Sequence, residues 1–569
     1  MAILGASFQI GRSALAAYQA AIAITGQNIA NLGNPDYARQ SGRLAALYGG
    51  MTSAGIAPGT GVNLSGLSRH VDLALEAQLR SALGARAGAQ TTYQTLNRIE
   101  GLYNELTDQD LSTQLTQFFA GFAGVQTDPL ESSARRLVIS NADAVIGTMQ
   151  RHRRGLLDQV QTLNATVEQV TSDANGLARE VAHLNELVVT AESRGQGGAN
   201  ALRDRRDALL RQLGELMDIQ TREQDNGIVN VYVGSEPLVD FNYSRGLKTV
   251  TVLEDGLERA SIRFADNNGS VLVRGGKLGA AVTARDVHVA SQLDQLDRLA
   301  GALIYEVNRA HASGQGLIGL TSATGTYAAR DAKAALNSMA AGLPFPIQNG
   351  TFVVRVKDQA TGQVTTTRIE VDLDGLDADT SLADLAAALN QVPGLGATVT
   401  PDNRLRLEAN SGCEFTFADD TSGALAALGV GTFFEGVNAS TIAVNAAVRA
   451  DPRLIAASAG GAPGDGDNAG RLAQLGSQAS ALLGNISIED YRQGVITALA
   501  VETAGAETAH EAADAVYSSL LAQREAISGV NLDEEAINLT KFERSFQGAS
   551  RFLGVLDSLA DEVLALVQP

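Results

Sequence analysis

Both ends of this sequence carry a narrow apolar stripe with the seven-residue repeat of a helix that packs against another helix. The residues of the two stripes are Phe8, Leu15, Ile22 and Ile29 at the start, and Leu539, Phe542, Phe546, Ala549, Leu553 and Leu556 at the end. A stripe this narrow covers only one partner helix. We therefore expect the two terminal helices to pack together, which makes the helical part of the fold discontinuous in sequence.

The first helix is predicted to end abruptly within "GQNIANLGNPDYARQ", which runs from Gly26 to Gln40. Gly33 favours a left-handed cap, and Pro35 cannot continue a helix. In front of the last helix, Asn531 and Glu534 have the spacing of a capping box.

A third apolar stripe, from Val160 to Val188, predicts a long internal helix. Helical patterning covers most of residues 71–220, with predicted breaks near Pro129, Gly155 and residues 193–200. After Gln220 the apolar period changes to two, which is typical of strands. The predicted strands lie in "GIVNVYVG", "KTVTVLED", "ASIRFAD" and "SVLVRGG".

A helix over residues 285–311 and a second β-rich region should follow, the latter around a helix that Ser381 and Asp384 cap. These patterns predict an α+β multidomain protein in which an elongated helical bundle or coiled coil, built from both chain ends, carries inserted β-rich domains. The predicted division is 1–40 with 529–569 as terminal helices, 41–220 with 470–528 as a long-helix bundle, 221–330 as a β-rich segment plus helix, and 331–469 as an inserted β-rich domain.

Composition excludes several classes of function. The chain has 569 residues and a formal net charge of −20, which repels nucleic acid phosphates. No apolar run approaches the ~18 residues of a membrane span, and the first residues lack the basic start of a secretory signal peptide. The single cysteine, Cys413, allows no disulfide within the chain, and the absence of tryptophan leaves few groups for stacking on sugars or bases.

No residue pattern predicts a catalytic site. "GDGDNAG" has the glycine spacing of a dinucleotide site but no preceding strand, and "HEAAD" has Asp514 where a second zinc-binding histidine would stand. The stretch "DLDGLDADT" gathers Asp372, Asp374, Asp377 and Asp379, and it leaves a calcium site open as the alternative to a solvated turn. We therefore predict a protein that is not an enzyme and that has no cofactor and no metal site.

The chain ends resemble those of the flagellar axial proteins, the family of rod, hook and hook-associated proteins. The N-terminal signature of that family is matched by Asn28, Ile29, Ala30, Asn31, Tyr37 and Arg39, with Asp36 where the family usually has glycine. From Gly529, "GVNLDEEAINLTKFERSFQGASRFLGVLD" is similar to the family's C-terminal signature.

Interior segments resemble the hook-associated protein 1 (hook–filament junction protein) family in particular. "GTGVNLSGLSRHVDLALEAQLR" places Arg69, Asp72 and Gln78 as that family does. "NALRDRRDALLRQLGEL" is similar to its Asn-x-Leu-x-Asp-x-Arg-Asp-x-Leu element, matched by Asn200, Leu202, Asp204, Arg206, Asp207 and Leu209.

The resemblance implies a structural adaptor that joins hook to filament outside the cell and is exported by the flagellar type III apparatus without a cleaved signal. It implies as partners further copies in a ring at the hook tip, hook protein, hook-associated protein 3, and the export apparatus with its chaperone, but no nucleic acid and no membrane insertion. The implied assembly interface consists of the two apolar stripes together with Asn28, Asn31, Tyr37 and Arg39. These helices are expected to become ordered on assembly, because each buries only a narrow stripe.

Two other interpretations stay open. A hook or distal-rod protein would share the chain ends, although the long helical region of residues 71–220 disfavours it. A secreted carbohydrate-binding or wall-degrading module would need an aromatic platform or a pair of convergent carboxylates, and the sequence predicts neither.

Overall fold

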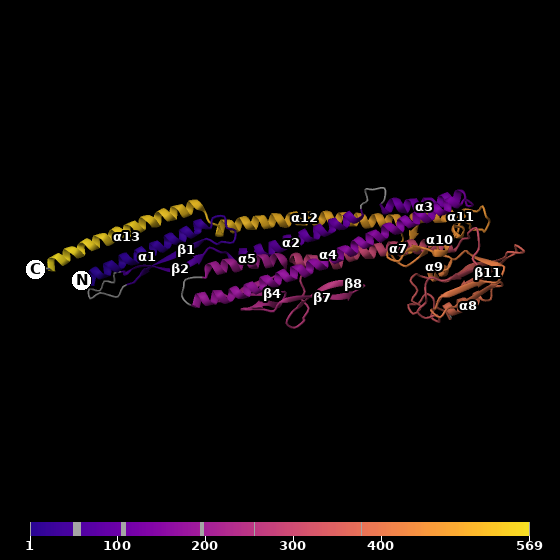
Figure 1. Ribbon diagram of the computed structural model, residues 1–569, viewed down its shortest axis with the longest axis horizontal. Helices are drawn as coiled ribbons and strands as arrows, with labels where there is room; N and C mark the ends of the chain where they lie inside the picture. Colours follow the sequence, from indigo (N-terminus) through magenta and orange to yellow (C-terminus); the bar gives the residue numbers. More distant parts are fainter. Residues whose placement is uncertain are drawn as a thin grey trace. The chain divides into compact units, whose positions relative to one another are not determined.

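The computed structural model describes residues 2–48, 59–103, 110–193, 199–254, 256–376 and 378–567, and it has the predicted α+β character (Figure 1). The chain forms two compact units. Unit 1 comprises Met1–Thr95, Thr162–Ala284 and Gly505–Pro569, and unit 2 comprises Leu96–Gln161 and Arg285–Ala504. Each unit draws on several of the segments predicted from the sequence, so the fourfold division of the chain stays a prediction.

In unit 1 the two terminal helices, α1 (Ala2–Ala30) and α13 (Leu532–Val567), lie side by side, with the two chain ends close together (Figure 1). They are antiparallel, because Gly11 meets Leu553 whereas Asn28 meets Glu535. A Cβ added to Gly11 would lie 2.5 Å from Leu553 Cδ2, so the missing side chain lets the helices approach closely. The predicted pairing of the terminal helices is confirmed.

The predicted cap of the first helix is also confirmed, since Gly33 adopts φ +77° just after α1 ends. The hairpin β1 (Gln40–Leu47) and β2 (Gly61–Arg69) then returns along α1, and Ser13 Oγ accepts a hydrogen bond from the Val62 amide. Helix α1 is thus covered on one side by α13 and on another by this hairpin.

Four helices follow: α2 (Leu73–Tyr103), α3 (Leu111–Thr127), α4 (Ser132–Ser193) and α5 (Asn200–Leu216). The predicted break at Pro129 separates α3 from α4, and the stripe from Val160 to Val188 is buried apart from the half-buried Leu177. The predicted break at Gly155 is wrong. Helix α4 continues through Gly155 because Leu102 packs where a side chain would stand, 2.8 Å from an added Cβ.

The β-rich part of unit 1 consists of two antiparallel sheets. Their strands are β3 (Gln220–Glu223), β4 (Val229–Val233), β5 (Glu236–Asp240) and β6 (Tyr243–Ser244), and then β7 (Leu247–Glu254) with β8 (Leu257–Phe264). The strand predicted in "SVLVRGG" is wrong, because Ser270 forms only an isolated bridge with Arg263. Val271 and Val273 alternate because they point into the core from a loop, ahead of helix α6 (Gly276–Thr283).

Unit 2 holds α3, the end of α2, the first half of α4 and the remaining elements. Its remaining helices are the π-helical η1 (Ala284–Val289, with Ala284 still in unit 1), α7 (Ala290–Ala312), α8 (Leu382–Leu389), α9 (Ala424–Leu428), α10 (Ala446–Ala450), η2 (Pro452–Leu454), α11 (Asp467–Gln474), η3 (Leu475–Ser477), η4 (Ala481–Leu483) and the first part of α12 (Ile488–Ser528). The predicted capping box of Ser381 and Asp384 at the start of α8 is confirmed.

The strands of unit 2 form two three-stranded sheets and two short pairs. The sheet orders are β11-β10-β14, β12-β13-β9, β15-β16 and β17-β18. The strands are β9 (Ser322–Thr324), β10 (Gly350–Asp358), β11 (Val364–Val371), β12 (Leu395–Val399), β13 (Leu405–Ala409), β14 (Cys413–Ala418), β15 (Phe434–Glu435), β16 (Ala443–Val444), β17 (Ala479–Ser480) and β18 (Ile486–Ser487).

An aromatic cluster forms the centre of unit 2. Phe118 and Phe122 of α3 contact Phe433, and Phe118 also contacts Phe434 and its neighbour Phe119, with ring centroids of neighbouring pairs 4.8 to 5.9 Å apart. These contacts tie the end of the segment 331–469 to α3. In the described part of the chain, no helix is both long and apolar enough to cross a membrane.

Replacing Phe118 by alanine should lower the free energy of unfolding of unit 2 by about 3–5 kcal/mol, because its ring is fully buried among four others. Urea unfolding followed by circular dichroism measures this change. The exposed Leu130 is the matched control, and Leu130→Ala should shift stability by less than about 0.5 kcal/mol. Equal effects of the two variants would contradict the assigned core.

A buried histidine gives unit 2 a pH dependence. His311 Nε2 accepts a hydrogen bond from the Ala456 amide and Nδ1 lies 2.8 Å from the Gly431 carbonyl, so the ring is held neutral. Burial lowers the pKa of His311 to about 4, below its unfolded value of about 6.5. The folded state therefore binds fewer protons, and stability is lost as the pH falls from about 6.5 to about 4.

The free energy of unfolding should fall over this pH range by as much as about 1.4 kcal/mol per pH unit for this histidine. His311→Gln, which can donate and accept the same hydrogen bonds without titrating, should have a shallower slope in urea unfolding measured from pH 7 to 4. An unchanged slope would show that His311 is not buried in its neutral form.

Candidate functional site

The polar residues of the segment between α1 and β1 converge on one buried amide, that of Asn28. Its Nδ2 donates to the Gln40 carbonyl at 2.9 Å and to Glu535 Oε2 at 3.0 Å. Its Oδ1 accepts from the Tyr37 hydroxyl at 2.7 Å and from the Gln40 amide at 3.1 Å. Asn28 is 1% exposed, so it bonds α1, the start of β1 and α13 together without help from solvent.

Arg39 bonds the segment between α1 and β1 to the start of α13. Its guanidinium donates to Glu535 Oε1 at 2.8 Å and to Glu534 Oε2 at 2.6 Å, and its backbone amide donates to the Ser528 carbonyl at the end of α12. Burial alone would lower the pKa of Arg39, but its two carboxylate partners raise it above the ordinary value. Burial, with the charges of Asp204 and Glu535, raises the pKa of Tyr37 to about 12, so its hydroxyl stays a donor.

Arg69 joins the hairpin to α5. Its Nη2 lies 2.7 Å from Asp204 Oδ1 and 2.5 Å from Asp207 Oδ2. Burial raises the pKa of Asp204 more than Arg69 lowers it. Asn200 of the same helix donates to the Gln40 side chain at 3.3 Å. The two interior motifs that resemble the hook-associated family, which contain Arg69 and Asn200, are thus bonded to each other. Through Asn200 and Gln40 they are also bonded to the N-terminal motif.

A second chain of ion pairs anchors the turn that contains Pro35 and Asp36. Arg211 of α5 donates to Asp36 Oδ1 at 2.6 Å and to Glu76 Oε2 at 3.1 Å. Arg524 of α12 donates to Glu76 Oε1 at 3.0 Å and to the Pro35 carbonyl at 2.5 Å. Asp36 is not among the described residues with positive φ, so this position does not require the glycine that the family usually has.

We call Asn28 and the polar residues bonded around it the terminal junction, which consists of Asn28, Pro35, Asp36, Tyr37, Arg39, Gln40, Arg69, Glu76, Asn200, Asp204, Asp207, Arg211, Arg524, Glu534 and Glu535. Sequence reasoning identified Asn28, Tyr37, Arg39, Arg69, Asp204 and Asp207, but missed Gln40, Glu76, Arg211, Arg524 and Glu535 as their partners. Four of the five missed residues lie inside the quoted motifs, where a charged or amide side chain in an otherwise matched stretch is the available signal. Asn31 stays outside the junction, since it bonds Gln27 and Asn34 within the turn.

The apolar stripes are only partly buried in the single chain. Phe8, Leu15, Ile22 and Ile29 are half-buried, as are Leu539, Phe542, Phe546, Ala549 and Leu553, and only Leu556 is buried. The buried positions of α1 are instead small or polar: Gly11, Ala17, Ala21, Thr25 and Asn28. Helix α1 contacts α13 on one side and the β1–β2 hairpin on the adjacent side. The residues of α1 that lie between these two contacts are therefore the most buried.

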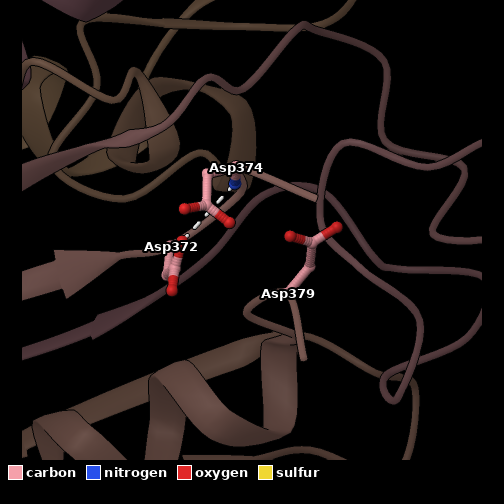
Figure 2. A group of neighbouring side chains, drawn as sticks. All are labelled: Asp372, Asp374 and Asp379. Carbon is pink, nitrogen blue, oxygen red and sulfur yellow. Dashed lines mark hydrogen bonds between the residues drawn. The ribbon is translucent and has the colours of Figure 1, made fainter. Parts of the chain in front are cut away.

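An acidic cluster lies apart from the junction, in unit 2. Figure 2 shows Asp372, Asp374 and Asp379, which each bring one oxygen within 4.8 Å of the others. Their carboxylates accept hydrogen bonds from the amides of Asp374, Leu376 and Gly375 in the same turn. Asp377 lies outside the described residues. Hydrogen bonding within the turn accounts for the arrangement, and we assign no metal to it.

Three comparisons with known proteins agree with one another. The family model described as "Flagellar hook-associated protein FlgK helical domain" matches residues 96–326. Flagellar hook-associated protein 1 of Escherichia coli (strain K12) is 25% identical over 97% of this chain and 98% of its own length. The protein of that name from Bacillus subtilis (strain 168) is 25% identical over 98% of this chain and 97% of its own length.

A solved structure shows the same fold. The flagellar hook junction protein FlgK from Burkholderia pseudomallei superposes with a TM-score of 0.50 at 16% identity, over 79% of this chain and 100% of that one. The paired terminal helices and the long internal helices, together with these relatives, define a structural protein of the bacterial flagellum. Over nearly its whole length the chain is similar to flagellar hook-associated protein 1. By their names, these relatives are hook-associated proteins of the flagellum, an extracellular appendage.

Replacing Asn28 by alanine should destabilise the terminal junction by about 2–3 kcal/mol, because Gln40, Tyr37 and Glu535 would lose buried partners. Asn31→Ala is the matched control, since Asn31 bonds only within an accessible turn and should change stability by less than about 0.5 kcal/mol. Hydrogen exchange at the Gln40 amide measures the local effect. Equal exchange in the two variants would contradict the central place of Asn28.

The acidic cluster gives a second test. A chelator such as EDTA should leave the thermal unfolding midpoint of the full chain unchanged, because backbone amides already occupy the carboxylates of Asp372, Asp374 and Asp379. A midpoint that falls in EDTA and recovers with added calcium would assign the cluster a metal.

Proposed function

We propose that this protein is the structural adaptor that joins hook to filament at the hook–filament junction. The observation that carries the proposal is the similarity to flagellar hook-associated protein 1 over nearly the whole of both chains. The terminal junction supports it, because residues of four motifs that resemble this family meet in one network of hydrogen bonds and ion pairs. The match of the helical domain over residues 96–326 favours this role over that of a hook or distal-rod protein.

The proposal includes a route and a set of partners. The chain is exported through the flagellar type III apparatus with its chaperone, and it forms a ring of copies at the hook tip. Hook protein lies on one side of the ring and hook-associated protein 3 on the other. The terminal helices polymerise, with Phe8, Leu15, Ile22 and Ile29 of α1 and the stripe of α13 as the interface. The half-burial of both stripes supports this role, because apolar surface is left for neighbouring subunits.

Deletion of the gene tests the adaptor role directly. Cells without it should carry hooks but no filaments, and should export filament protein into the medium. Expression of the full chain should restore filaments, and an antibody against it should label the hook tip. Filaments of normal length on cells that lack the gene would overturn the proposal.

Placing a charge on either stripe tests the interface. Ile29→Asp or Leu553→Asp should abolish incorporation at the hook tip, because a buried carboxylate without a partner costs several kcal/mol. Both residues are half-buried in the single chain, so the thermal midpoint of the purified monomer should shift little. Gln547→Asp, on an exposed position of α13, is the control and should incorporate normally. Filaments restored by Ile29→Asp and Leu553→Asp would refute this use of the stripes.

A further inference from the structure

Unit 2 contains a cleft of about 630 Å³ that takes no part in the terminal junction. Arg309 lines it from the last turn of α7, and Arg471 and Leu475 line it from α11 and η3. Further lining residues come from the segments 346–348 and 478–485. We call this the α7–α11 cleft. Ligand sites in proteins commonly have volumes of about 300–1,000 Å³, so the cleft is large enough to hold a few residues of a peptide.

Two arginines line the α7–α11 cleft without a close counter-charge. The Arg309 guanidinium lies 3.9 Å from the Glu306 carboxylate, and the Arg309 side chain is 52% exposed. Arg471 is exposed, and no carboxylate in the described part of the chain lies within 4 Å of its guanidinium. A guanidinium in this state offers several N–H donors and a full positive charge, which is the combination that binds carboxylates.

The two acidic residues of the cleft are already bonded within the chain. Glu306 Oε1 accepts a hydrogen bond from Ser480 Oγ at 2.8 Å. The Asp420 carboxylate accepts from the backbone amides of Gly423 at 2.9 Å and Leu425 at 3.1 Å. The charged groups of the cleft that still lack a close partner are therefore the two guanidinium groups, although the chain as a whole has a formal net charge of −20. This pattern favours an anionic ligand.

Apolar and amide side chains lie in the same cleft as the arginines. The apolar lining residues are Pro346, Ile347, Leu475 and Leu482, and the exposed amide side chains are those of Gln348, Gln478 and Asn485. Amide side chains can bond both the N–H and the C=O groups of a peptide backbone, and apolar surface accepts an aliphatic side chain. The lining therefore matches a peptide that carries both carboxylates and apolar residues.

The aromatic ring of the cleft is not open for stacking. Tyr305 is buried, its ring is stacked on that of Phe345 with centroids 5.5 Å apart, and its hydroxyl donates to the Pro346 carbonyl at 3.0 Å. Sugars and nucleic acid bases are usually bound against an open aromatic face. An acidic peptide therefore fits the cleft better than a sugar or a nucleotide does.

We propose that the α7–α11 cleft binds an extended acidic segment of another protein, with carboxylates at Arg309 and Arg471 and an aliphatic side chain against Leu475 and Leu482. The complementary charge of the two guanidinium groups selects this partner. The inference goes beyond the adaptor role and does not depend on it, because the site lies within unit 2 and its binding is measured on the purified chain.

Fluorescence anisotropy with the purified full-length chain tests the proposal. The probes are two pools of N-terminally fluorescein-labelled hexapeptide amides, one alternating Asp or Glu with Leu, Ile or Val, the other alternating Lys or Arg with the same apolar residues. The acidic pool should bind and the basic pool should not, and added salt should weaken the binding. Arg309→Gln and Arg471→Gln should each weaken it by about tenfold. Arg298→Gln is the matched control, since Arg298 pairs with Asp294 on α7 outside the cleft.

A charge reversal gives a result that loss of folding cannot imitate. The double variant Arg309→Glu with Arg471→Glu should bind the basic pool in preference to the acidic pool. Because both arginines are exposed, the thermal unfolding midpoint of each variant should stay close to that of the unmodified chain.

Three outcomes would overturn this inference. They are equal binding, or no binding, of the two pools; unchanged binding of the acidic pool by both glutamine variants; and displacement of the labelled acidic peptides by an excess of chain that carries Arg309→Gln and Arg471→Gln together. That chain lacks the cleft's charges but keeps its other surfaces, so displacement would show that a second copy is the occupant. Each of these outcomes leaves the adaptor role standing, whereas filaments on cells that lack the gene would overturn the adaptor role alone.

Discussion

The hydrogen bond from Asn28 to Glu535 is the contact on which the geometry of the chain ends depends. It joins a helix near the start of the chain to one near its end, and Tyr37, Arg39 and Gln40 are placed by the same two side chains. An amide serves better than a carboxylate or an amine here, since Asn28 must donate to Glu535 and accept from Tyr37 at once.

The ion pairs around this hydrogen bond fix the relative placement of the helices more than they add to the stability of the fold. Burying a charge costs about as much as its pairing returns, so Arg69, Arg211 and Arg524 add little net free energy with their partners. A wrong arrangement would leave those charges buried without partners, at much greater cost. The network therefore selects one relative placement of α1, α2, α5, α12 and α13, and an assembly interface built on the first and last helices inherits that placement.

Features that depend on residues close together in the sequence could be predicted, whereas contacts between distant residues could not. The helices at both ends and the stripe of α4 were predictable because seven-residue periodicity is local. The pairing of Asn28 with Glu535 was not, since no periodicity links residues so far apart. The break predicted at Gly155 was wrong because the sequence does not distinguish a glycine that ends a helix from one that makes room for a packed side chain, here that of Leu102. "SVLVRGG" was misread because Val271 and Val273 alternate in a loop as they would in a strand.

The separation of 507 positions between Asn28 and Glu535 also has a kinetic consequence. Long-range contacts form late, because the intervening chain must first be present and closed into a loop. Helix α1 is therefore synthesised long before its partner α13. Until α13 has been made, the β1–β2 hairpin is the partner against which α1 can pack. The hydrogen bond between Asn28 and Glu535 can form only after α13 has been synthesised.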